Sequence, residues 1–295
     1  MIIEVKNLKK QYKKQSVLKG INITVDKPQI IALVGPNGSG KTTLLNCMTN
    51  LIPFNEGEVK LLGKKNKDAS LFYELSYLQD NQILYGNLTG YDHLKFICDV
   101  QKIPLSEINK VAKNVGMEGY LKKRVRNYSL GMKQHLLLTM SIINQPKLLL
   151  LDEPLTGLDP TSAINVRRIL LELYEEGTTI FLSSHNLDEI DRLTNTIYFM
   201  KDGELLKESL QELTTNHYLV SVNDIERATQ ILDEGKISYD VTAANEIELK
   251  ESTITLQNFI NQFNKTDITI LDIEKKKVGA EKRYQELFED GHEGK

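Results

Sequence analysis

The sequence predicts an α/β protein that carries a helical insert and ends in a small α+β domain. Residues 30–34 and 148–151 are continuous apolar runs, as expected for strands buried on both faces of a sheet. A glycine-rich turn follows the first run, and residues 42–52 after it have the apolar spacing of a helix. The succession of strand, glycine loop and helix is typical of α/β folds.

The elements can be placed in order along the first part of the chain. Residues 2–12 and 21–34 are rich in β-forming residues, and Asp26, Lys27 and Pro28 form the expected turn within the second stretch. Residues from about 88 to 145 show helical spacing and few β signals, which predicts a helical insert in the α/β core. Helix and strand then alternate again from residue 148 to about residue 203.

The pattern changes after Leu213. Residues 217–275 read as strand, helix, strand, strand, helix, strand, the order of the split βαβ, ferredoxin-like motif. The amphipathic residues 281–290 are expected to form a further helix. We therefore expect an α/β domain over residues 1–212 and a regulatory or dimerisation domain over residues 213–295.

The composition limits the classes of function. The 295 residues carry a formal net charge of −3, so the balance does not indicate a basic protein that binds nucleic acid. Cys47 and Cys98 have neither a metal-ligand spacing nor a CxxC spacing, and they suit a reducing compartment. We expect no nucleic-acid partner and no disulfide.

No segment of the sequence is expected to cross a membrane. The longest apolar runs are much shorter than the roughly 20 residues that a bilayer requires. The N-terminus carries Glu4, Lys6, Lys9 and Lys10 and lacks the continuous apolar stretch of a signal peptide. A cytoplasmic protein is expected, and any role at the membrane would need a partner.

The glycine-rich turn fits the phosphate-binding pattern GxxxxGK[ST]. Its glycines allow backbone N–H groups to point at phosphate oxygens beside the positive end of the following helix. Lys41 is expected to reach the β- and γ-phosphates, and the Thr42 hydroxyl is expected to bind Mg²⁺. The nucleotide-binding residues predicted here are Gly35, Pro36, Asn37, Gly38, Ser39, Gly40, Lys41, Thr42 and Thr43.

Two carboxylates follow the second buried strand. Asp152 ends the run LLLLD, and the C-terminal tip of such a strand faces the crevice where α/β sheets bind ligands. Asp152 is expected to hold Mg²⁺ directly or through water. Glu153 should point differently, toward the attacking water.

With these motifs in place, residues 1–212 resemble the ABC ATPase family. The resemblance implies that Tyr12 stacks on adenine and that Gln79 touches Mg²⁺ and senses a membrane partner. Residues 128–134, YSLGMKQ, are similar to the family signature LSGGQ. Tyr128, Leu130 and Met132 depart from it, as in a subset of bacterial exporters of antibiotics and peptides, whereas Ser129 and Gly131 are kept.

Two further motifs complete the resemblance. Residues 157–160, GLDP, match the D-loop, which implies that Asp159 lies at the nucleotide site. Residues 183–185 match the switch histidine, which implies that His185 bonds the γ-phosphate.

The resemblance also implies a mechanism. Two cassettes pack head to tail, so that ATP at Lys41 of one is capped by Ser129 and Gly131 of the other. Glu153 then acts as general base or orients the water, while His185 and Mg²⁺ counter the developing charge. The chain has one phosphate loop and one signature, so its implied partners are a second ABC ATPase subunit and a multi-span permease at the membrane.

Three functions follow from the resemblance. The leading expectation is the ATPase subunit of an exporter of antibiotics, peptides or other amphipathic compounds. An importer ATPase is the alternative, although the C-terminal domains of importers are more often small β-barrels. A soluble ABC ATPase of translation or DNA repair would more often carry two cassettes or a long coiled-coil insert.

Overall fold

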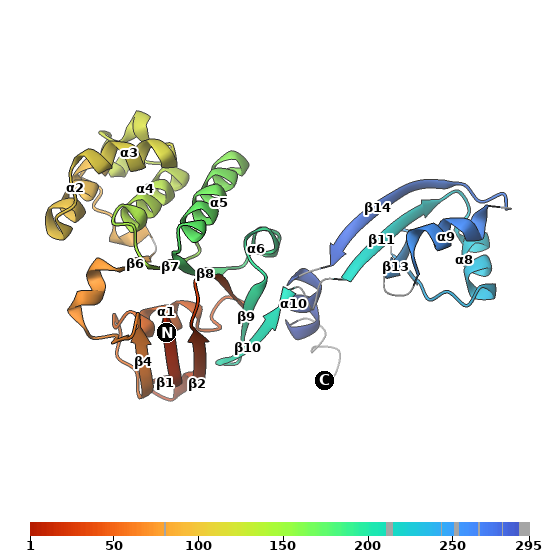
Figure 1. Ribbon diagram of the computed structural model, residues 1–295, viewed down its shortest axis with the longest axis horizontal. Coiled ribbons are helices and arrows are strands. Elements are labelled where there is room, and N and C mark those ends of the chain that lie inside the picture. The colour runs from red at the N-terminus through yellow and green to blue at the C-terminus, as the bar shows by residue number, and fades with distance from the viewer. Residues whose placement is uncertain are drawn as a thin grey trace. The chain divides into compact units, whose positions relative to one another are not determined.

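The computed structural model describes residues 1–79, 81–210, 215–242, 244–250, 254–264, 266–278 and 280–288. The chain divides into two compact units, Met1–Glu208 and Ser209–Lys295 (Figure 1). The boundary expected after residue 212 falls in residues 211–214, outside the described residues. Each unit has its own buried apolar cluster.

The first unit is built on a six-stranded sheet in the order β10-β9-β3-β8-β7-β6. Strand β3 is parallel to β8 and β9, and β7 is parallel to β6 and β8. Strands β3 and β8 are buried along their whole length, and accordingly β3 is a continuous apolar run and β8 contains the apolar residues Ile180, Phe181 and Leu182 in succession. The strands are β3 Ile30–Val34, β6 Leu75–Leu78, β7 Leu148–Asp152, β8 Thr179–Ser184, β9 Thr196–Lys201 and β10 Glu204–Ser209.

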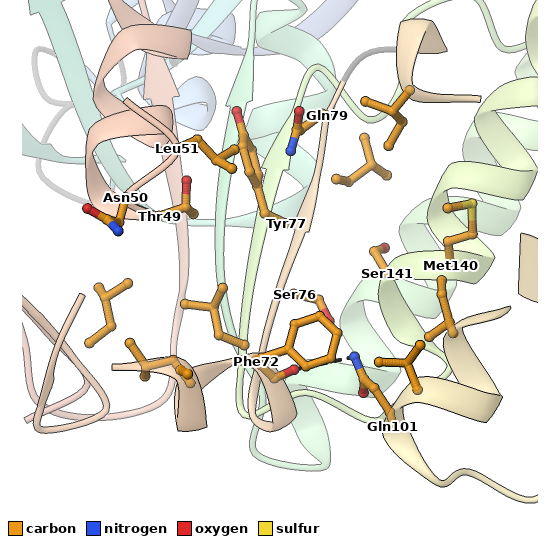
Figure 2. A pocket seen from close by; sticks show the side chains of 18 of the residues that line it. Thr49, Asn50, Leu51, Phe72, Ser76, Tyr77, Gln79, Gln101, Met140 and Ser141 are labelled. Carbon is orange, nitrogen blue, oxygen red and sulfur yellow. Dashed lines mark hydrogen bonds between the residues drawn. The ribbon is translucent and has the colours of Figure 1, made fainter. Parts of the chain in front are cut away.

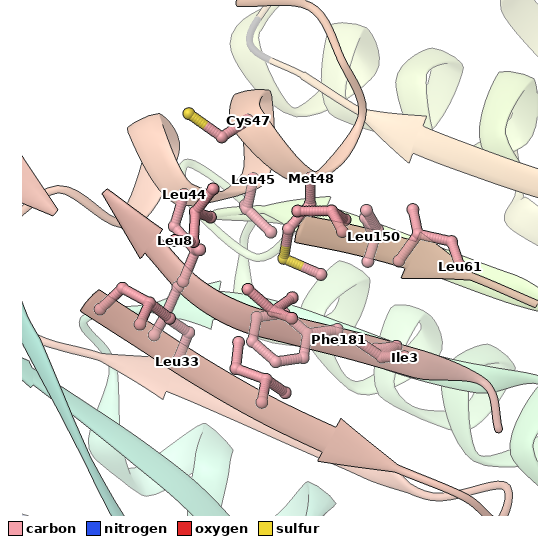
Figure 3. Close-up of a cluster of buried hydrophobic side chains, with 14 of the residues drawn as sticks. Ile3, Leu8, Leu33, Leu44, Leu45, Cys47, Met48, Leu61, Leu150 and Phe181 are labelled. Carbon is pink, nitrogen blue, oxygen red and sulfur yellow. The ribbon is translucent and has the colours of Figure 1, made fainter. Parts of the chain in front are cut away.

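A second sheet of four strands has the order β2-β1-β4-β5 and antiparallel pairs. Its strands are β1 Ile3–Tyr12, β2 Gln15–Val25, β4 Glu56–Leu61 and β5 Lys64–Lys65. Helix α1, Lys41–Met48, lies between the two sheets: Leu44 and Leu45 pack with Leu8 of β1 and Phe181 of β8 (Figure 3). This apolar cluster fixes the helix that begins at Lys41.

The segment predicted as a helical insert contains α2 Gly90–Gln101, α3 Ser106–Val115 and α4 Leu130–Ile142. Helix α2 begins where the sequence provides a capping box: Thr89 accepts from Asp92 N–H, and the Asp92 carboxylate accepts from Thr89 N–H. The three helices share a core around Leu94, Ile108 and Leu136. Two short 3₁₀ turns, Glu118–Tyr120 and Val125–Asn127, lie between α3 and α4.

Two more helices of the first unit, α5 Pro160–Glu175 and α6 Leu187–Leu193, follow strands β7 and β8. Helix α5 is joined to the insert because the Asn165 amide donates to the last carbonyls of α3, with Nδ2 3.1 Å from Val115 O. Helix α5 is therefore bonded to the C-terminal end of α3 in the helical insert.

The second unit contains β11 Thr215–Val222, α8 Ile225–Glu234, β12 Asp240–Val241, β13 Ile247–Lys250, α9 Leu256–Phe263, β14 Ile270–Val278 and α10 Ala280–Phe288. Its four strands form a sheet in the order β12-β13-β11-β14, and each neighbouring pair is antiparallel. Both helices α8 and α9 contribute to the core, through Leu232 and Phe259, against Val220 and Ile247 of the sheet. Among the described residues of the whole chain, no helix is long and apolar enough to cross a bilayer.

Candidate functional site

The loop between β3 and α1 is shaped by its glycines. Gly38 and Gly40 have φ angles of 81° and 110°, in the left-handed region that glycine adopts without steric cost. At Gly35 the constraint is space, because a Cβ would lie 2.6 Å from the carbonyl oxygen of Met200. Gly40 directly precedes α1, whose first N–H groups have no partners within the helix and face the loop.

Lys41 is 7% exposed and is turned back into this loop. Its Nζ donates to the carbonyl oxygens of Gly35 and Pro36, at 2.6 and 3.2 Å. Burial lowers the pKa of Lys41, and the nearby carboxylates of Glu153 and Asp152 partly counter this effect. The Ser39 hydroxyl is buried and has no hydrogen-bond partner in the described part of the chain. The loop therefore offers a buried cation and a free hydroxyl to an incoming anion.

Thr42 and Asp152 are 110 residues apart in sequence but meet at the end of the sheet. The Thr42 hydroxyl donates to Asp152 Oδ2 at 2.6 Å. Ser183, on the neighbouring strand β8, donates to the other carboxylate oxygen. The register of β7 and β8 causes this contact, since it pairs Asp152 with Ser183. The Asp152 carboxylate is thus fixed at both oxygens.

Glu153 has a φ of +51°, which turns the chain sharply after β7. Such a conformation is costly for a residue with a side chain and persists only where its surroundings hold it. Here the Glu153 N–H donates to Ser183 Oγ at 3.0 Å, and its carbonyl oxygen accepts from Gln134 Nε2 at 3.2 Å. Gln134 also donates to Pro154 O at 2.9 Å. The turn that Glu153 makes after β7 is thus fixed by hydrogen bonds with β8 and α4.

The Glu153 carboxylate has two side-chain partners. His185 Nδ1 lies 2.8 Å from its Oε2, and Thr156 Oγ1 donates to the same oxygen at 3.3 Å. The Glu153 side chain is 27% exposed and that of His185 is 60% exposed. Water can therefore reach a carboxylate whose orientation the protein fixes.

The other predicted residues surround this centre. Tyr12 is exposed at the end of β1, and Lys10 Nζ lies 4.6 Å from the centroid of its ring. Gln79 follows β6 and lines a groove (Figure 2). Asp159 caps α5 by accepting from the N–H groups of Thr161 and Ser162.

Ser129 is the N-cap residue of α4 and accepts from Met132 N–H at 3.2 Å. Gly131 follows in the first turn, and a Cβ there would lie 3.5 Å from the Gly157 carbonyl oxygen. The intervening Leu130 covers Gly157 directly, since a Cβ on Gly157 would lie 2.3 Å from Leu130 Cδ2. The signature and the D-loop are thus in contact within one chain.

The structure gives a reason for the tyrosine in the signature. The Tyr128 hydroxyl donates to Tyr120 O at 2.8 Å, and the two rings meet edge to face. Gly90 makes room for it, because a Cβ on Gly90 would lie 2.5 Å from the Tyr128 hydroxyl oxygen. Tyr128 therefore anchors the start of α4 to the rest of the helical insert.

Ser183 and Gln134 were not among the site residues predicted from the sequence. A signal was present for both, because Ser183 is a polar residue that follows the apolar run of β8 and Gln134 is a polar residue on the buried side of α4. Neither pattern indicates which group the side chain contacts, because the hydrogen-bond partners of Ser183 and Gln134 come from distant parts of the chain.

Comparison with known proteins agrees with this geometry. The family model described as ABC transporter matches residues 18–156. The lantibiotic transport ATP-binding protein SrtF of Streptococcus pyogenes is 35% identical over 225 residues, covering 74% of this chain and 98% of the relative. The bacitracin transport ATP-binding protein BcrA of Enterococcus faecalis is 35% identical over 266 residues, covering 88% and 84% of the two chains.

Two solved structures share the fold of the first unit. The structure of the ATP-binding subunit of an ABC transporter is 26% identical, with a TM-score of 0.67, covering 72% of this chain and 92% of that one. A dimeric ATP-binding cassette in a post-hydrolysis state, 23% identical with a TM-score of 0.66, covers 71% of this chain and 99% of its own. The chain belongs to the ATP-binding subunits of ABC transporters and is an ATPase of that family.

Proposed function

We propose that this ATPase energises a membrane exporter of antibiotics, peptides or related amphipathic compounds. The observation that carries the ATPase chemistry is the hydrogen bond between Thr42 and Asp152 beside Lys41, with Glu153 next in the chain and His185 bonded to Glu153. The class of transported compound is supported by the relatives, whose names refer to lantibiotic and bacitracin transport.

The residues present fit a nucleotide phosphate chain and a magnesium ion. The buried Ser39 hydroxyl, which has no partner among the described residues, and the buried Lys41 ammonium are donors suited to phosphate oxygens. The Thr42 hydroxyl and the Asp152 carboxylate are neighbouring oxygen donors, the type that Mg²⁺ prefers. These two residues, with Gln79, would hold the ion, which neutralises charge on the β- and γ-phosphates when bound.

The protein's own groups then have distinct tasks. Lys41 binds the β- and γ-phosphates, and Tyr12 offers its ring to the adenine. Glu153 accepts the proton of the water that attacks the γ-phosphorus, while the bond from that phosphorus to the bridging oxygen breaks and ADP leaves. His185 holds the Glu153 carboxylate in place until a γ-phosphate offers it a second acceptor.

A second copy or a paralogue completes the site. Ser129 is the N-cap residue of α4 and Gly131 lies in its first turn, where the helix N-terminus favours an anion. In the proposed dimer they cap the γ-phosphate bound at Lys41 of the other subunit, and Asp159 lies at the same interface. Loss of the γ-phosphate on hydrolysis removes the bridge between the subunits.

The membrane subunit is proposed to dock in the groove that Gln79 lines. This groove has a volume of about 490 Å³ and lies between the end of α1, strand β6 and helices α2 and α4 (Figure 2). Exposed apolar side chains line it, with Leu51 53%, Phe72 50% and Phe96 69% exposed. Docking there would place the permease in direct contact with Gln79 and with the helical insert.

For the second unit we propose a ferredoxin-like fold and a role in regulating or stabilising the dimer. Its antiparallel sheet order and its two helices on one core support the fold.

The proposed exporter function is tested by expressing the chain with a candidate permease in sensitive cells. Resistance to bacitracin or to a lanthionine peptide is expected, and it should be lost with Glu153→Gln. Accumulation of the compound inside the cells would instead support an importer.

A further inference from the structure

Four cations crowd the loop before the signature. Lys122, Lys123, Arg124 and Arg126 occupy four of five consecutive positions, and all are exposed. In the part of the chain that the structure describes, none of them forms an ion pair with a carboxylate. Because the chain as a whole has a net charge of −3, this positive charge is local.

Exposed apolar side chains lie beside these cations. The segment 85–89 runs antiparallel to the loop: Arg126 N–H donates to Gly86 O and Val125 N–H donates to Leu88 O, both at 2.9 Å. Tyr85 is 70% exposed and Leu88 is 42% exposed. We call Tyr85, Leu88, Lys122, Lys123, Arg124 and Arg126 the basic-aromatic patch.

A buried histidine holds the segment that carries Tyr85 and Leu88 in place. Buried His93 accepts from Tyr85 N–H at its Nε2, at 3.0 Å, and its Nδ1 donates to Thr89 O at 2.7 Å. The neighbouring acid Asp92 is already engaged, since its carboxylate accepts from both the N–H and the hydroxyl of Thr89. The segment 85–89, which is bonded to the loop that carries the cations, is thus ordered by hydrogen bonds with buried His93. Asp92, the acid that follows this segment, uses its carboxylate to cap α2.

We propose that the basic-aromatic patch binds the anionic phospholipid headgroups of a membrane surface. Lysine and arginine near such a surface are attracted to its negative potential, and tyrosine is favoured where an apolar layer meets water. Flexible lysine stems suit a fluid layer of phosphates, whereas an acidic protein segment presents fixed carboxylates and gives no reason for the exposed Tyr85 and Leu88. This contact goes beyond the proposed function, because it needs neither ATP nor the permease.

The test uses the full chain and vesicles of phosphatidylcholine with or without about one third phosphatidylglycerol, at about 0.1 M salt. Binding is expected only with phosphatidylglycerol and should weaken strongly at about 0.5 M salt. A triple variant, Lys122→Ser, Lys123→Ser and Arg124→Ser, should bind on the order of 100-fold more weakly, at roughly fivefold for each cation. Tyr85→Ser should weaken binding without changing its dependence on salt.

The matched control removes the same charge elsewhere on the first unit, with Lys14→Ser, Lys27→Ser and Lys65→Ser, all at exposed positions. It should bind the vesicles almost as well as the parent chain. Equal losses in the two triple variants would overturn the proposal, because net charge alone would then explain binding. Absence of binding to anionic vesicles would also overturn the proposal. If, in that case, the triple variant of the basic-aromatic patch lost binding to the permease, the patch would instead be a contact for an acidic protein segment. Each variant should keep the ATP affinity of the parent, which checks its folding and leaves the proposed ATPase function separate.

Discussion

His185 and Glu153 are joined by a hydrogen bond at the edge of the parallel sheet, with Nδ1 of the imidazole 2.8 Å from Oε2 of the carboxylate. They follow neighbouring strands, β8 and β7, so the register of those strands sets the contact. The Asp152 carboxylate is engaged separately by Thr42 and Ser183. The adjacent acids Asp152 and Glu153 therefore have different partners, which allows their roles to be separated experimentally.

Glu153→Gln should separate binding from hydrolysis. The amide keeps the shape but cannot accept the proton of the water, so single-turnover hydrolysis should slow on the order of 100-fold or more. Mg-ATP affinity should stay close to that of the parent chain. Light scattering should show a monomer without nucleotide and an ATP-bound dimer with this variant. Near-normal hydrolysis by Glu153→Gln would contradict the catalytic role of Glu153. The control is Glu175→Gln, at the exposed end of α5, which should hydrolyse ATP like the parent chain.

Lys41→Ala should act on nucleotide binding itself. It removes a charge-assisted contact to phosphate, which corresponds to a loss of affinity of roughly 10- to 100-fold. Calorimetric titration with a non-hydrolysable ATP analogue measures this directly, with Lys14→Ala as an exposed control. Unchanged affinity in Lys41→Ala would show that the loop does not hold the phosphates in the way proposed.

Ser183→Ala tests the link between the two acids. The variant loses the bond to the Asp152 carboxylate and leaves the Glu153 N–H without its partner. We expect a higher magnesium requirement and a slower kcat, with a free energy of unfolding lowered by about 1–3 kcal/mol. Ser184→Ala, at the next buried serine of β8, should change stability without changing the magnesium requirement. If both variants shifted the magnesium dependence equally, Ser183 would have no special role.

Glu74 should make stability depend on pH in the acid range. Hydrogen bonds from Lys147 and Lys64 lower the pKa of Glu74 to about 2. A carboxyl with a depressed pKa stabilises the fold above its unfolded value of 4.5, and this contribution is lost as the pH falls from 4.5 toward about 2. Urea unfolding of Glu74→Gln should therefore match the parent more closely as the pH is lowered through that window. A gap between the two proteins that widened on acidification would contradict this assignment.

Truncation after Leu210 tests the independence of the second unit. The first unit contains the phosphate loop, both acids and the signature helix, so the shortened chain should keep its ATP affinity within a few-fold. Circular dichroism and cooperative unfolding would first confirm that it folds. A folded truncated chain that no longer bound ATP would show that the second unit contributes to the nucleotide site.

Short stretches of sequence were enough to predict the phosphate loop and the acids that end β7. The apolar run 30–34, the glycines and Lys41 act locally, through backbone conformation and the start of a helix, so their pattern is readable without the fold. The helices between residues 88 and 145 were readable for the same reason, because spacing of apolar residues is a local property. Strand β4 was not predicted, since its pairing with β1 depends on distant residues, and neither was the two-residue strand β5 that pairs with β4.

Only the tertiary structure decided how the site is held together. The contact of Thr42 with Asp152 and the two bonds of Ser183 arise from the order and register of parallel strands, which no local pattern encodes. The positive φ of Glu153 likewise depends on Gln134, which donates to its carbonyl oxygen from helix α4. Chemistry that resides in a residue type and its immediate neighbours can be read from the sequence. Orientation requires the fold, because it is set by hydrogen bonds between segments that meet only when the core has packed.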